Sequence, residues 1–97
     1  MAAEYDYSLL KSCGEDVFIS ANVEICRPYT VSLGNHVTID TGLYCTVKVD
    51  IGDYIHIGPY VIVIGEEQGY LQTGHFTTIA TGSRIVPQRQ EFVGIGS

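Results

Sequence analysis

The chain has 97 residues, of which 45% are hydrophobic and only 16% charged, and its net charge is −6. The five basic residues are scattered and leave no basic stripe for a nucleic-acid backbone, and no apolar run is long enough to cross a bilayer. We therefore expect one small domain without a nucleic-acid partner or a membrane span. Because the first four residues lack the basic start and apolar core of a signal peptide, we also expect a cytoplasmic protein.

Residues 1–12 precede any repeat and are predicted to form a short N-terminal helical cap. Within it, the sequence EYDYSLLKS (residues 4–12) is typical of a short helix or turn. We expect Leu9 and Leu10 to face inward, where they would plug the end of the structure that follows.

Residues 13–97 follow a six-residue period, which is plainest in IGDYIHIGPYVI (residues 51–62). Because strand side chains alternate between two faces, the first and fifth residues of a hexad share a face, and the recurrent Gly after the first residue permits close backbone approach. The pattern predicts stacked short strands around an apolar interior. Hexads begin at Cys13, Ile19, Ile25, Leu33, Ile39, Cys45, Ile51, Ile57, Val63, Thr73, Ile79 and Ile85.

The hexad frame slips twice. It slips by two residues between Tyr29 and Leu33, where we expect a bulge, and by four between Val63 and Thr73, where we expect a loop at 65–72 that protrudes from the rod. Tyr29, Glu67 and Arg89 are the residues that break the apolar or small pattern at the fifth hexad position.

The three cysteines and the aromatic residues take their expected positions from the same frame. Cys13 and Cys45 begin hexads and should be buried, whereas Cys26 should face outward. The odd cysteine count and the absence of CxxC spacing argue against a disulfide framework. Several rings are predicted at outward or corner positions and indicate surfaces for association: Phe18, Tyr44, Tyr54, Tyr60 and Phe76.

Three stretches, SLGNHVTID, VDIGDYIHIGPYVIVIG and GHFTTIATGSRI, resemble the hexapeptide-repeat acyltransferase family, most closely the N-terminal half of bacterial sugar and lipopolysaccharide O-acetyltransferases. The resemblance implies an all-β fold, a left-handed parallel β-helix of about four triangular coils, and a homotrimer. It also implies acyl-CoA-dependent O- or N-acetyl transfer, with acetyl-CoA as co-substrate and a sugar as acceptor.

Stacking the coils as this resemblance implies places Asn35, Asp53 and His75 in one column at the third hexad position. Neighbouring strands lie roughly 4.8 Å apart, so Asp53 and His75 become neighbours. A carboxylate beside an imidazole fixes its tautomer and raises its basicity, which suits a base that takes a proton from a hydroxyl. His75 and Asp53 are therefore candidate catalytic residues, with a surface pair as the alternative.

His56 is a second candidate base. It closes the hexad that begins at Ile51, with Thr38 and Thr78 expected on the neighbouring coils, and the alternative is a solvent-exposed corner histidine. His36 is interpreted as an ordinary surface residue. Against the negative net charge, the candidates for binding the acyl donor are Lys48, Arg84 and Arg89.

Two departures from the resembling enzymes favour an alternative function. Those enzymes commonly carry a catalytic His in a loop just after a hexad, whereas the corresponding stretches here are GEEQGY and QRQEFVG. They also continue for several further coils. These departures are consistent with either of two alternatives, a truncated enzyme or a non-catalytic trimeric structural module.

A third interpretation is a zinc enzyme like the γ-class carbonic anhydrases, which share the fold and bind zinc through three histidines across a subunit boundary. This chain has three histidines. Their spacings of twenty and nineteen residues provide no close pair on one strand, so no metal is expected.

Overall fold

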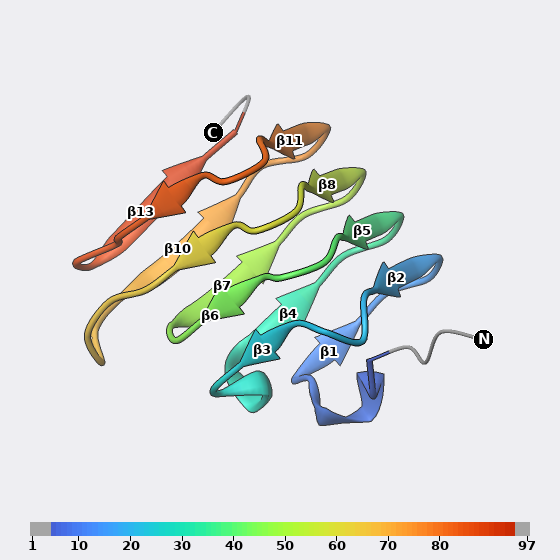
Figure 1. The fold of residues 1–97 in the computed structure, drawn as a ribbon, viewed down its shortest axis with the longest axis horizontal. Helices are drawn as coiled ribbons and strands as arrows, with labels where there is room; N and C mark the ends of the chain where they lie inside the picture. Colours follow the sequence, from blue (N-terminus) through green and yellow to red (C-terminus); the bar gives the residue numbers. More distant parts are fainter. Residues whose placement is uncertain (1–4, 95–97) are drawn as a thin grey trace.

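The computed structural model describes residues 5–94, which wind into a parallel β-solenoid of about four coils with three parallel sheets (Figure 1). The predicted all-β fold with triangular coils is confirmed. The first sheet contains β1 (Ser12–Cys13), β4 (Val31–Leu33), β7 (Lys48–Ile51), β10 (Tyr70–Thr73) and β13 (Gln90–Val93). The second contains β2 (Val17–Ile19), β5 (Val37–Ile39), β8 (Ile55–Ile57) and β11 (Thr77–Ile79). The third contains β3 (Glu24–Ile25), β6 (Tyr44–Cys45), β9 (Ile62–Val63) and β12 (Arg84–Ile85).

The hexad starts form the inward columns of the solenoid. In the second sheet they pair directly as Ile19, Ile39, Ile57 and Ile79, and all four are buried. The third sheet stacks Ile25, Cys45, Val63 and Ile85 in the same way. Each fully buried aliphatic side chain contributes roughly 1.5–3 kcal/mol. The six-residue period therefore encodes the packing of the core.

Both slips of the hexad frame are absorbed outside the columns. In an unbroken hexad frame, Tyr29 and Glu67 would occupy inward positions. Because of the slips, Val31 and Leu71 take these positions instead, and both pair with Val49. The first insertion forms a 3-10 turn, η2 (Pro28–Thr30), and not the expected bulge, because Pro28 has a fixed φ and no N–H for a ladder. The second occupies residues 64–69, since β10 already begins at Tyr70.

The N-terminal segment covers the first coil. The described part of the predicted cap contains one 3-10 turn, η1 (Tyr7–Leu9), and residues 1–4 lie outside the described residues. The backbone N–H of Ile19 donates to Tyr7 Oη at 3.1 Å, and the Ile19 carbonyl accepts from Tyr5 N–H at 3.2 Å. Leu10 is buried as predicted, but the expectation for Leu9 was wrong: it is 50% exposed, because two consecutive residues leaving a 3-10 turn do not share one face.

The cysteine predictions are confirmed for two residues and wrong for the third. Cys45 is buried and Cys26 is exposed. Burial raises the pKa of the Cys45 thiol to about 11, so this thiol is protonated at neutral pH. Cys13 is exposed although it begins a hexad, because it lies in the first coil and its column continues on one side only, at Leu33.

At the corner between the first and second sheets, the fourth residue of the hexads that begin at Cys13, Leu33, Ile51 and Thr73 has a left-handed backbone conformation. Asp16, His36, Tyr54 and Phe76 have φ values of 57°, 59°, 58° and 55°. Left-handed backbone is uncommon outside glycine, so its recurrence at this corner reflects the geometry of the coil. The five aromatic side chains predicted to face outward are all exposed, as expected. Phe76 is the most exposed of them, at 70%.

Candidate functional site

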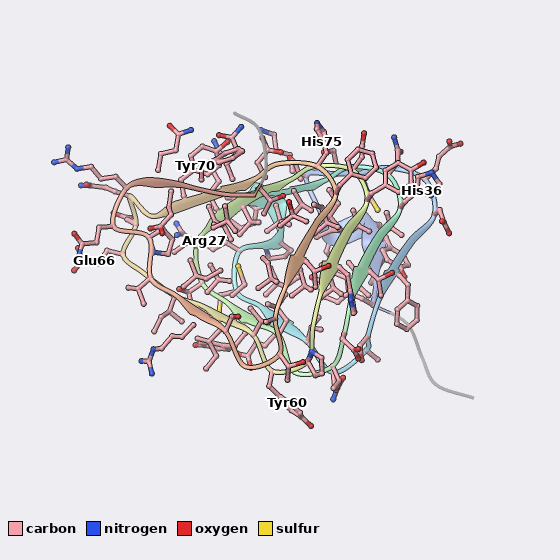
Figure 2. All side chains as sticks on the ribbon, turned by 90° about the horizontal axis from the view of Figure 1, so that it is seen from above. Arg27, His36, Tyr60, Glu66, Tyr70 and His75 are labelled. Carbon is pink, nitrogen blue, oxygen red and sulfur yellow. The ribbon has the colours of Figure 1, made fainter. Side chains whose placement is uncertain are left out.

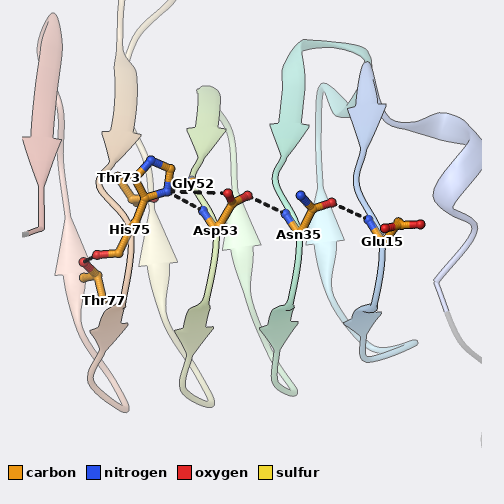
Figure 3. Close-up of polar contacts among 7 residues, drawn as sticks. All are labelled: Glu15, Asn35, Gly52, Asp53, Thr73, His75 and Thr77. Atoms are coloured by element: carbon orange, nitrogen blue, oxygen red, sulfur yellow. Dashed lines mark hydrogen bonds and ion pairs between the residues drawn. The ribbon is translucent and has the colours of Figure 1, made fainter.

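A ladder of side chains runs along the solenoid beside this corner, at the third hexad position (Figure 3). Asn35 Oδ1 accepts from the backbone N–H of Glu15, and Asp53 Oδ1 accepts from the backbone N–H of Asn35, both at 2.7 Å. His75 Nδ1 accepts from the backbone N–H of Asp53 at 2.8 Å. Each side chain therefore satisfies a backbone donor of the preceding coil, as the predicted column of Asn35, Asp53 and His75 requires.

The hydrogen-bond partner of His75 in this ladder differs from the predicted one. The nearest Asp53 carboxylate oxygen, Oδ2, lies 3.9 Å from His75 Nδ1, while the Asp53 amide nitrogen is at 2.8 Å. Because Nδ1 accepts a hydrogen bond, the neutral ring carries its proton on Nε2. The predicted neighbours are thus in place, but the backbone amide and not the carboxylate sets the tautomer. Neither nitrogen of this neutral ring has an unused lone pair.

His56 lies on the outer face of β8, with Thr38 and Thr78 directly beside it on the neighbouring coils, as predicted. Its Nε2 is 4.0 Å from Asp40 Oδ2, and about half of each side chain is exposed. Within residues 5–94, no hydrogen bond engages the His56 ring. The imidazole is consequently available to a ligand, with a carboxylate near enough to interact with its charged form.

His36 has the closest carboxylate partner of the three histidines, although the sequence interpretation treated it as ordinary surface. Its Nδ1 is 2.8 Å from Asp16 Oδ2. The ring also stacks on Tyr54, which in turn stacks on Phe76. The sequence held the signal: Asp16 and His36 both occupy the fourth hexad position, one coil apart.

The three basic residues proposed for the acyl donor lie on different elements and do not form one cluster. Lys48 begins β7 in the first sheet, Arg84 begins β12 in the third sheet, and Arg89 lies between β12 and β13. Lys48 Nζ sits 4.7 Å from the centre of the Tyr70 ring, a cation–π contact. Burial, followed by the nearby Asp50 carboxylate, raises the pKa of Tyr70.

An open hollow of about 400 Å³ lies at the corner between the third and first sheets, on the side of the molecule where Figure 2 shows Glu66. Its lining includes one acidic side chain, Glu66, and one basic side chain, Arg89, together with Pro87. Figure 2 places this corner on the opposite side from His36 and His75. The lining residues are Gly65, Glu66, Val86, Pro87, Gln88 and Arg89.

Across residues 5–94, no group of three or more His, Cys, Asp and Glu side chains converges as metal ligands within one chain. The zinc interpretation would therefore have to draw its ligands from more than one subunit. In the same part of the chain, no helix is long and apolar enough to cross a membrane.

The stacked coils define the chain as a parallel β-solenoid of the hexapeptide-repeat type. In a comparison with curated proteins it is 32% identical over 89 residues to a dTDP-4-amino-4,6-dideoxy-D-glucose acyltransferase from Escherichia coli. The match covers 87% of this chain and 44% of that relative, so the chain spans less than half of the relative's length. The chain is thus a distant homologue of a sugar acyltransferase of the hexapeptide-repeat family.

No family model matches the chain, and no solved structure matches it either.

Proposed function

We propose that the chain provides the β-solenoid of an acyltransferase that moves an acyl group from acyl-CoA to a sugar, with acetyl-CoA as donor. Its homology to a sugar acyltransferase over 87% of its length carries the proposal. The relative's name points to a nucleotide-linked amino sugar as the acceptor class, so the acceptor atom would be an amine nitrogen. The fold and the repeat are consistent with this role, while fold alone would not define it.

The proposed reaction needs a base that takes a proton from the acceptor as it attacks the thioester. Of the residues predicted from the sequence, His56 has a free ring beside Asp40. His75 and Asp53 are engaged in the ladder, which argues for a structural role at that column. The predicted pair therefore suits the reaction less well than its sequence pattern indicated.

We further propose that the active form is a cytoplasmic homotrimer. Exposed rings support association, since Tyr60 and Phe76 are 63% and 70% exposed and a monomer seldom leaves several such rings in water. Association would also bring basic residues of different subunits together. In one subunit, Lys48, Arg84 and Arg89 lie too dispersed to neutralise the phosphates of a CoA donor.

A non-catalytic trimeric module is the second candidate function. The observation that favours it is the ladder itself, because it uses His75 to pair a backbone amide and leaves its ring without a free lone pair. In that case the solenoid would keep the scaffold of the family without its chemistry.

Equilibrium titration with acetyl-CoA by calorimetry distinguishes the two candidates. At a concentration where sedimentation has established the oligomer, we expect binding in roughly the micromolar range, typical of enzyme substrates. A matched variant, Lys48→Ala with Arg84→Ala, should weaken donor binding at unchanged oligomeric state. Absence of heat at about millimolar donor would contradict the acyltransferase proposal and favour the structural module.

A further inference from the structure

The three histidines differ in what holds each ring. His75 uses Nδ1 as an acceptor for a backbone amide, and His56 faces a carboxylate oxygen at 4.0 Å. His36 makes a carboxylate contact of hydrogen-bond length, 2.8 Å from Nδ1 to Asp16 Oδ2. This is the arrangement of a carboxylate-oriented imidazole, in which the second nitrogen is left for chemistry.

The contact with Asp16 assigns the tautomer of the neutral His36 ring. An ionised carboxylate can only accept a hydrogen bond, so Nδ1 carries the proton and Nε2 carries the lone pair. Among residues 5–94, no group forms a hydrogen bond with Nε2, and 42% of the side chain is exposed. The free lone pair of His36 is therefore open to a substrate.

The orientation of the His36 ring is fixed by stacking. Its centroid lies 4.5 Å from that of Tyr54 with an interplanar angle of 23°, and Tyr54 lies 4.9 Å from Phe76 at 9°. The backbone at this corner is also held in place. His36 N–H donates to the Glu15 carbonyl at 2.8 Å, and the His36 carbonyl accepts from Ile55 N–H at 3.2 Å. Ring, tautomer and backbone are thus all restrained, as a base requires.

We infer that His36 is the general base of the acyl transfer and that Asp16 is its positioning residue. This inference rests on the proposed function. As the acceptor amine attacks the thioester carbonyl carbon, the new C–N bond forms and the C–S bond breaks. The amine's proton passes to His36 Nε2, and His36 then returns it to the departing CoA thiolate, so that CoA leaves as the thiol.

The test compares acyl transfer to a nucleotide-linked amino sugar by the wild-type chain and single-residue variants. We expect His36→Gln to lower kcat at least 100-fold, which is within the range for loss of a general base. Glu24→Gln, the control, should stay within about threefold of wild type, since it also places a glutamine at an exposed position but on β3, outside the proposed site. If His36→Gln keeps wild-type turnover, the inference is wrong and the proposed function survives. If the wild-type chain transfers nothing, both fail.

Asp16 is tested by kinetics together with a spectroscopic readout. Asp16→Ala should lower kcat with KM unchanged, and Asp16→Asn, whose side-chain carbonyl can still accept from Nδ1–H, should restore part of the loss. ¹⁵N chemical shifts of the wild-type imidazoles should show the Nδ1–H tautomer at His36 and the Nε2–H tautomer at His75. A His36 ring protonated on Nε2 in its neutral form would overturn the assignment.

Discussion

Replacing Ile57 with Asp is expected to unfold the chain. Ile57 is 3% exposed and lies between Ile39 and Ile79 in the central inward column of the second sheet. Both paired neighbours are buried and aliphatic, so the new carboxylate would be buried against them without a charged partner, at a cost of several kcal/mol. Since domains of this size are stable by about 5–15 kcal/mol, one such substitution removes much or all of the stability.

The control for this prediction is Thr78→Asp. Thr78 lies on β11 beside the same column but faces solvent, so it introduces the same charge outside the core. Circular dichroism and urea unfolding should show a cooperative transition for Thr78→Asp and none for Ile57→Asp. A folded Ile57→Asp variant with the same unfolding midpoint as the control would show that the inward register is misassigned.

Replacing Leu71 with Ala should be the second most damaging change, with an expected cost of about 2–5 kcal/mol. Leu71 is 1% exposed on β10, where it restores the inward column after the insertion at residues 64–69. The substitution leaves a cavity on β10 beside Val49 of β7. Its effect should appear as a lower urea midpoint at nearly unchanged slope.

Leu9→Ala is the matched control, because it makes the same chemical change at a half-exposed leucine of η1. We expect it to cost less than about 1 kcal/mol, as a surface truncation does. Equal costs for the two variants would contradict the assignment of Leu71 to the core and of Leu9 to the surface.

Much of the fold could be predicted because, in a solenoid, the period of the sequence determines which residues stack in the core. An apolar residue every six positions predicts the inward column of the second sheet, from Ile19 to Ile79, and the strand pairing confirms it. The ends of the solenoid were harder to predict. Cys13 obeys the pattern but has a neighbour on one side only, so it is exposed where an inner coil would bury it.

The candidate site was predictable to the level of neighbours and not of hydrogen bonds. The frame placed Asp53 beside His75, and they are adjacent in the ladder. Which atom of Asp53 meets the ring depends on side-chain rotamers and on which backbone donors lack partners, and periodicity carries neither. The same frame, extended one coil toward the N-terminus, would also have paired Asp16 with His36.

The measurement that tests the central claim most directly is acyl transfer by the purified wild-type chain in its established oligomeric state. Acetyl-CoA and a nucleotide-linked amino sugar would be incubated with it, and the sugar product and free CoA thiol quantified by mass spectrometry. We predict an acylated sugar and CoA in equal amounts, formed in proportion to protein. Donor binding without any acylated product across such acceptors would contradict the enzyme and leave the solenoid as a structural module.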